Sequence, residues 1–279
     1  MKIVSNRYGK KRVRVLKILR AAARHEVMEL DVGCLLQGDF DASYSAGDNR
    51  QVIPTDTIKN TVTALAHQCL GPEIERFGLE LGRHFLSQYP QVREIEVKIG
   101  LRRWLRHAVA GEPHPHVFIG GAGTPFARVT CTRGGAEAVE SGMGDLLILK
   151  STGSGFAGYP KCDFTTLPET TDRILATRVR AAWTFATPPA DFNAANASIL
   201  EAMLRVFALN YSPSVQATLY EMAGAALAAC SAILRVSLTL PNRHYLLANL
   251  KPFGLDNPNV TFVPTDQPHG QIEAVIERD

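Results

Sequence analysis

The order of hydrophobic patterns occurs twice along the chain, and this repetition restricts the possible folds more than any other feature. In residues 25–40, apolar side chains recur at every second position from Met28 to Leu36, which is typical of a half-buried strand. Residues 10–19 alternate in a similar way and suggest a hairpin partner. Helical spacing follows at 56–70 and 72–89, and strand patterns return at 93–105, 116–119 and 126–133.

The second half of the chain repeats this order. Strand patterns lie at 145–152 and 178–185, helical patterns at 191–209 and 212–233, and further strand patterns at 235–240, 260–264 and 270–278. Consecutive strands with no helix between them indicate antiparallel pairing, because parallel neighbours need a crossover connection. We therefore expect an α+β fold of two tandem antiparallel β-sheet modules, each with a helix pair. The glycine-rich stretch 132–144 separates them, and we assign the modules to residues 1–136 and 137–279.

Composition excludes several classes of protein. The chain has 279 residues, 46% of them hydrophobic, which is enough for one large or two ordinary cores. Its formal net charge of +3 is small and its basic residues are scattered, so we expect no nucleic-acid partner. The longest apolar stretch, 222–234, is shorter than the ~18 residues that span a bilayer, and the first ten residues contain no signal-peptide core. These features predict a cytoplasmic protein without a membrane partner.

The cysteines and histidines give little support for a metal site. Five cysteines lie far apart with no C-x-x-C spacing, which argues against a disulfide framework or a zinc knuckle. His114 and His116 could in principle coordinate a metal ion. Prolines on both sides of His114 instead favour a rigid exposed connection.

The stretch "GSGFAG", from Gly153 to Gly158, has the spacing G-x-G-x-x-G directly after an apolar run. A dinucleotide-binding loop needs these glycines to open a helix, and here helical signals are delayed until 168–175. A phosphate-binding loop of the Walker type is also excluded, because no G-K-[ST] follows. We expect a strand running into a flexible turn that presents Phe156, followed by a helical segment that carries Arg173. Taken alone, these two residues are better interpreted as a core aromatic and an exposed helical arginine.

Seven blocks of sequence, in the same order, resemble the urate oxidase (uricase) family. The blocks are "YGK" at 8–10, "TDTIKNTV" at 55–62, "LKSTGSGF" at 149–156, "TTLPETTDRIL" at 165–175, "SVQATLYEM" at 214–222, "LPNRHY" at 240–245 and "DNPN" at 256–259. The resemblance covers nearly the whole chain. It implies the tunnelling fold, in which two sheet-plus-helix-pair modules per chain assemble as a homotetramer into a hollow barrel, with active sites at the subunit interfaces.

The activity implied by the resemblance is oxidation of urate by dioxygen and water to 5-hydroxyisourate and hydrogen peroxide, in purine degradation. The enzyme would be a cofactor-free oxidoreductase that uses no metal, flavin or haem, with O2 as co-substrate. By the same resemblance Phe156 would stack on the purine, Arg173 and Gln216 would bind its edges, and the Val215 backbone would add a contact. These residue types suit a purinedione, because a guanidinium donates two parallel hydrogen bonds and a carboxamide both donates and accepts.

The resemblance also implies a proton-transfer group of Lys10, Thr55 and His244. Thr55 would also bind the substrate, as would Asp56 beside its edge and Asn242 near the dioxygen or water site. Triplet dioxygen reacts poorly with closed-shell molecules, so the enzyme must deprotonate urate into an electron-rich anion. A lysine that acts as base must be partly neutral near pH 7, which requires desolvation or a nearby cation. Without the resemblance, ordinary roles are available: a solvated lysine, a helix N-cap and a strand-edge histidine.

The sequence departs from the family pattern in three places, and two other functions are open for a chain with this fold. Pro54 and Arg243 stand where many relatives have alanine and lysine, and the C-terminal "IEAVIERD" lacks the Ser-Lys-Leu peroxisomal signal. A pterin- or purine-converting enzyme on the same fold would normally supply a His/Cys or three-His zinc site. A non-catalytic purine-binding protein would keep Phe156, Arg173 and Gln216 but lose the proton-transfer group.

Overall fold

The structure is a computed structural model that describes residues 1–20 and 23–278. The chain forms two compact units. Unit 1 comprises Met1–Gly142 with Thr184–Ala194, and unit 2 comprises Met143–Trp183 with Ala195–Asp279. The assignment of modules to 1–136 and 137–279 stays a prediction. Within the described residues, no helix is long and apolar enough to cross a membrane.

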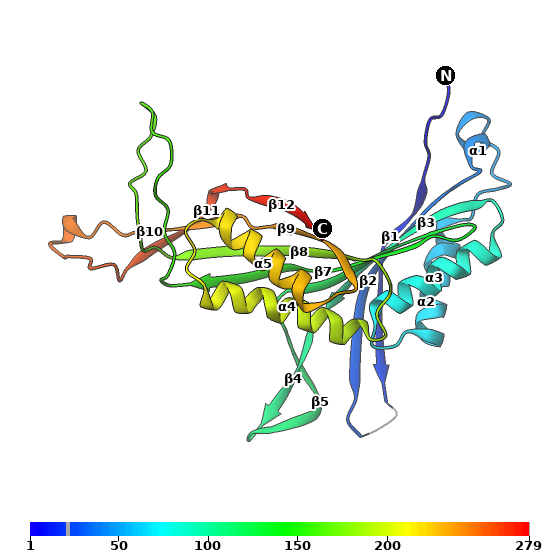
Figure 1. Cartoon of the computed structure of the whole chain (residues 1–279). Helices are drawn as coiled ribbons and strands as arrows, with labels where there is room; N and C mark the ends of the chain where they lie inside the picture. The colour runs from blue at the N-terminus through cyan, green and yellow to red at the C-terminus, as the bar shows by residue number, and fades with distance from the viewer. Residues whose placement is uncertain (21–22, 279) are drawn as a thin grey trace. The chain divides into compact units, whose positions relative to one another are not determined.

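Unit 1 is an antiparallel sheet with two helices on one face (Figure 1). Its strands are β1 (Tyr8–Leu19), β2 (Glu26–Gly38), β3 (Val92–Arg102) and β6 (Thr124–Thr132), which pair in that order and are followed by the start of β7 (Glu137–Lys150). Its helices are α1 (Asp41–Ser45), α2 (Thr55–Cys69) and α3 (Ile74–Gln88). β4 (Trp104–Val109) and β5 (Glu112–Gly120) form a separate two-stranded ribbon.

The core of unit 1 lies between α2, α3 and one face of the sheet. Its fully buried side chains include Val32, Leu36, Ile58, Val62, Phe77, Leu81, Phe85, Val97, Ile99 and Val129. A Cβ on Gly78 would lie 2.7 Å from Cγ2 of Val129, so glycine lets α3 approach the sheet closely. The Lys17 ammonium donates to three carbonyls at the end of α2, at 2.9–3.0 Å, and so fixes that helix to β1.

Unit 2 repeats the arrangement of sheet and helix pair. It contains the rest of β7, most of β8 (Leu175–Phe185), β9 (Ile233–Thr239), β10 (Asn242–Leu247), β11 (Phe262–Gly270), β12 (Glu273–Glu277), a 3-10 turn (Lys251–Phe253), most of α4 (Phe192–Leu209) and α5 (Val215–Ala229). β8 pairs with β9 and β10, which in turn pair with β12 and β11. The buried side chains include Ala181, Trp183, Ile199, Met203, Leu219, Met222, Ala226, Val236 and Leu238.

The predicted α+β class with antiparallel sheets and helix pairs is confirmed, but three local predictions were wrong. The segment 168–175 is not helical: it is irregular until β8 begins, because its backbone bonds to the Phe156 loop instead. The proline-flanked His114 lies in strand β5 rather than in a rigid connection, which an edge strand tolerates. β10 was not anticipated, since its sequence "NRHYLL" has no clear alternation.

Candidate functional site

The connection between β7 and β8 carries Phe156 on a loop that is bonded on two sides. The Phe156 N–H donates to the Thr170 carbonyl at 2.7 Å, and the Thr170 N–H donates back at 3.0 Å. The Gly155 N–H donates to the Ser212 carbonyl at 2.8 Å, and the Ser212 N–H donates to the Gly153 carbonyl at 2.9 Å. The backbone of the Phe156 loop is therefore held between the segment before β8 and the segment before α5.

Gly155 is required at the centre of this arrangement. A Cβ at this position would collide with the Tyr211 hydroxyl and lie 2.9 Å from the Thr170 carbonyl oxygen. The Tyr211 hydroxyl donates to the Thr171 carbonyl at 2.9 Å, so it cannot move away without losing that bond. Glycine therefore allows the Phe156 loop and the segment before α5 to approach closely.

Arg173 lies beside the Phe156 ring with unused hydrogen-bonding capacity. Its N–H donates to the Ser154 carbonyl at 2.8 Å, and its guanidinium carbon lies 5.4 Å from the ring centroid of Phe156. Burial lowers the pKa of Arg173, while Tyr211 acts in the opposite direction. The Arg173 Nε is buried and has no hydrogen-bond partner among the described residues. A buried donor without a partner is costly, so this arrangement favours a ligand that presents an acceptor.

The first turn of α5 presents Val215 and Gln216. Ser214 is the N-cap, and its side chain accepts from the Ala217 N–H at 3.1 Å. Val215 is buried and Gln216 is exposed. The first N–H groups of a helix have no partner within the helix, and this end carries partial positive charge. Because the Phe156 loop bonds to the residues just before α5, its aromatic ring and an anion-favouring helix end belong to one local structure.

Asn242 and His244 lie on β10 of the same unit. Asn242 is paired with Thr177 of β8, and the register with β11 shifts before His244. Both side chains are partly exposed. No hydrogen bond or ring contact made by the described residues joins either side chain to Phe156 or Arg173. The structure thus brings together Phe156, Arg173 and the segment that leads into α5, and within its described residues no hydrogen bond or ring contact links them to the two β10 side chains.

Lys10 and Thr55 belong to unit 1, where Tyr8 links the elements that carry them. Tyr8 and Lys10 lie two residues apart on β1. The Tyr8 hydroxyl accepts from the Ile53 N–H at 2.7 Å, which ties β1 to the chain just before α2. Thr55 is the first residue of α2 and is exposed, while Pro54 occupies the N-cap position. The ordinary role of Thr55 as an N-cap is therefore not realised.

Asp56 follows Thr55 and is already engaged with its own helix. Its carboxylate accepts from the Lys59 ammonium at 2.5 Å and from the Asn60 amide at 3.0 Å. The Lys59 hydrogen bond is the main cause of a lowered Asp56 pKa, and the Lys10 charge also lowers it. Lys10 and Asp56 are thus within electrostatic reach of one another, in the same unit as Thr55.

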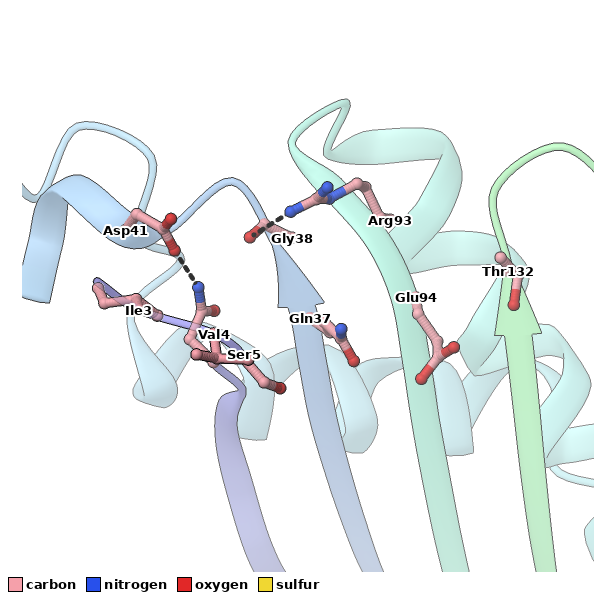
Figure 2. Close-up of a pocket in the computed structure, with 10 residues that line it drawn as sticks. Ile3, Val4, Ser5, Gln37, Gly38, Asp41, Arg93, Glu94 and Thr132 are labelled. Carbon is pink, nitrogen blue, oxygen red and sulfur yellow. Dashed lines mark hydrogen bonds between the residues drawn. The ribbon is translucent and has the colours of Figure 1, made fainter.

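A cavity of about 310 Å³ in unit 1 contains none of the predicted site residues (Figure 2). It is lined by Ile3, Val4, Ser5, Asn6, Gln37, Gly38, Asp41, Arg93, Glu94 and Thr132. The Asn6 amide donates to the Asp41 carboxylate, and the Arg93 guanidinium donates to the Gly38 carbonyl at 3.3 Å. This polar cavity offers no aromatic face on which a flat ligand could stack.

The histidine pair considered as a metal site lies on β5. The ring centroids of His114 and His116 are 4.6 Å apart, and the His116 N–H donates to Nδ1 of His114 at 3.4 Å. Among residues 1–20 and 23–278, no group of three His, Cys, Asp or Glu side chains is arranged to hold a metal ion.

Two residues that shape the Phe156 loop were not anticipated. Tyr211 packs on Gly155, as described above, and the Asp172 carboxylate accepts from the Thr152 hydroxyl at 2.8 Å and from the Gly153 N–H at 3.1 Å. Asp172 directly precedes Arg173, and its position inside the block at 165–175 that resembles the uricase family was its one signal in the sequence. Its contacts link residues twenty positions apart, which no local pattern predicts.

Comparison with known proteins gives one consistent result. A model of the family described as "Uricase" matches residues 6–130 and 139–273. A uricase from Cyberlindnera jadinii is 42% identical, with 98% of this chain and 96% of that protein covered. A uricase from Arthrobacter globiformis is 41% identical, with 98% of this chain and 89% of that protein covered.

Solved structures agree with the sequence comparison. The crystal structure of the Arthrobacter globiformis uricase superposes with a TM-score of 0.94 at 41% identity, covering 100% of this chain and 96% of that chain. The urate oxidase of Bacillus sp. TB-90 has a TM-score of 0.86 at 19% identity, which shows a shared fold over 98% of this chain. The family match over most of the residues and the full-length relatives lead to one conclusion: this chain belongs to the uricase family.

Proposed function

We propose that this protein is a urate oxidase, which converts urate, dioxygen and water to 5-hydroxyisourate and hydrogen peroxide in purine degradation. The observation that carries the proposal is the buried Arg173 Nε without a partner among the described residues, beside the Phe156 ring, whose loop bonds to the residues just before α5. A flat, anionic ligand with acceptor atoms on its edge satisfies all three features. The relatives described above are uricases, so neither alternative function gains support.

Binding of urate follows from the chemistry of the side chains in unit 2. The Phe156 ring offers a face on which the purine stacks, and the Arg173 guanidinium donates to acceptors on the purine edge. Gln216 both donates and accepts at another edge, and the Val215 backbone adds a contact at the positive end of α5. These four groups fix the orientation of the ring without any covalent chemistry.

The reaction requires removal of a proton from urate and transfer of two electrons to dioxygen. Lys10, Thr55 and His244 move the proton, with the Thr55 hydroxyl conveying it, and Asn242 binds dioxygen or water. Asp56, held by Lys59, lies at the substrate edge. The two electrons come from urate and reduce O2 to hydrogen peroxide, and water supplies the hydroxyl group that is added to the oxidised ring. Atoms and electrons balance without a further oxidant or reductant.

Because urate supplies both electrons, the proposal includes no metal, flavin or haem, and dioxygen is the only co-substrate. We expect purified protein, treated exhaustively with a chelator, to remove urate from solution at an unchanged rate and to show no visible absorbance. The assay is loss of the near-ultraviolet absorbance of urate together with oxygen uptake. Activity that disappears on chelation and returns with a metal alone would contradict this part of the proposal. We also propose a cytoplasmic location.

We further propose that the protein works as a homotetramer with active sites at subunit interfaces. Unit 1 carries Lys10 and Thr55, and unit 2 carries the Phe156 and Arg173 pair. An isologous interface that joins unit 1 of one protomer to unit 2 of its neighbour would create two equivalent sites at once. In such an assembly one protomer supplies the proton-transfer residues and the other supplies the purine-binding residues.

Mixing two inactive variants tests this arrangement. Co-expressed Thr55→Ala and Arg173→Ala subunits should regain activity, because a subunit intact in unit 1 meets one intact in unit 2. Random pairing restores roughly a quarter of the sites, and the opposite pairing holds both lesions. Native mass spectrometry verifies that hybrid tetramers are present. Hybrids that show no more activity than the sum of the parent variants would mean that each site is built within one chain.

A further inference from the structure

The Phe156 ring is covered on one face by a second aromatic ring, that of Tyr159. The two ring centroids are 4.8 Å apart and the ring planes differ by 16°. This parallel arrangement lies within the range of favourable aromatic stacking. Phe156 is only partly buried, and the Arg173 guanidinium carbon lies 5.4 Å from its ring centroid.

Tyr159 and its neighbour Gly158 are held by hydrogen bonds to Leu167 and Glu169, which lie later in the same connection between β7 and β8. The Tyr159 hydroxyl donates to the Leu167 carbonyl at 2.5 Å. Gly158, with φ of +74°, makes the turn that returns Tyr159 toward Phe156. The Gly158 N–H donates to Glu169 at 3.3 Å, and the same carboxylate pairs with the Lys161 ammonium at 3.2 Å.

The backbone of Phe156 is held by its bonds to Thr170, but these bonds leave the side-chain torsions free. A phenyl ring on an exposed loop would otherwise sample several rotamers, and a ligand that stacks on it would have to order it. A neighbouring ring that is held in place can fix the orientation of the Phe156 ring before the ligand binds. Tyr159, anchored to Leu167, has the position and the rigidity for this role.

We propose that Tyr159 is a positioning residue for substrate binding: it backs the Phe156 ring and leaves the opposite face for the flat purine. The inference rests on the proposed function, because it assumes that Phe156 stacks on urate. Tyr159 would act on binding through Phe156 and would take no part in proton transfer. Its loss should therefore change the affinity for urate far more than kcat.

The test measures urate binding to the assembled protein without oxygen, when no turnover can occur, and then KM and kcat in air. Removing the ring in Tyr159→Leu should raise the dissociation constant for urate by about 3- to 10-fold, the usual effect of one aromatic pair, and leave kcat within about threefold. Tyr159→Phe keeps the ring but loses the bond to Leu167 that anchors it, so its urate affinity should lie between those of the wild type and Tyr159→Leu. Phe164→Leu is the matched control, since Phe164 lies on the same connection and is 92% exposed.

Three results would overturn the proposal. Unchanged urate affinity in Tyr159→Leu would show that Phe156 needs no support. Tighter urate binding would show that Tyr159 occupies the face that the purine uses. An equal loss in Tyr159→Leu and Phe164→Leu, with lower Tm in both, would indicate a general structural role. If Tyr159→Leu does not fold, Tyr159→Met, which better preserves the volume, replaces it. Failure of the wild type to bind urate would instead refute the proposed function.

Discussion

Replacement of Lys10 by Met, or of Thr55 by Ala, is expected to lower kcat by about 10²- to 10⁴-fold, the usual contribution of general acid–base groups. Neither residue belongs to the purine-binding set in unit 2, so KM for urate should change much less. Steady-state kinetics with urate, at saturating oxygen, measure both parameters. A lower active fraction would also reduce the apparent kcat at unchanged KM, so kcat is calculated per urate-binding site, titrated in the absence of oxygen.

Matched controls lie next to each position. Lys11→Met removes the same charge from the adjacent, exposed residue of β1. Thr63→Ala removes a hydroxyl from the same helix as Thr55, where its one hydrogen bond to a described residue is to the Lys59 carbonyl. Both controls should retain nearly full activity. A Lys10→Met enzyme whose kcat stays within about twofold of the wild type would remove Lys10 from the proposed proton-transfer group.

Arg173→Ala is expected to raise KM for urate by about 10- to 150-fold, since a hydrogen bond to a charged group contributes about 1.5–3 kcal/mol. The same change should not lower Tm, because the Arg173 Nε has no partner among the described residues of the protein. A buried donor without a partner in the free protein gains one when urate binds. Its removal should therefore weaken urate binding without lowering Tm. Thermal unfolding and steady-state kinetics of one variant measure both.

Two further variants sharpen the result for Arg173. Arg173→Lys keeps the positive charge but loses the planar set of donors, so KM should stay well above that of the wild type. Arg178→Ala is the control: it removes an exposed guanidinium of β8 that pairs with Asp145 at 2.5 Å, and exposed ion pairs contribute little. An Arg173→Ala enzyme with unchanged KM, or one with strongly reduced Tm, would indicate that Arg173 has a structural role.

Much of the fold could be predicted from the sequence, because apolar residues recur at strand or helix spacing in most elements, although β10 lacks such a pattern. The alternation from Leu30 to Leu36 is matched by side chains that are at most 2% exposed. The segment around Arg173 shows the limit of this reasoning. Its local signals suggested a helix, but bonds from Arg173 to Ser154 and between Thr170 and Phe156 hold it in an irregular conformation. Tertiary contacts overrode the local preference.

The candidate site was predicted from matching blocks of sequence rather than from periodicity. Lys10, Thr55 and His244 have no pattern that distinguishes a proton-transfer group from surface residues. The supporting residues were harder to find still. Tyr159 and Tyr211 support the Phe156 loop through a stacked ring and through contact with Gly155, and such contacts exist only once the chain has folded.

The most direct test of the account is the stoichiometry of the reaction in purified protein with urate and air as the only reactants. Loss of the near-ultraviolet absorbance of urate, oxygen uptake and peroxide formation should proceed in equal amounts, and urate should remain unchanged when oxygen is excluded. Binding of urate without its loss in air would contradict the account and identify a purine-binding protein. Urate loss without oxygen uptake would require a different reaction.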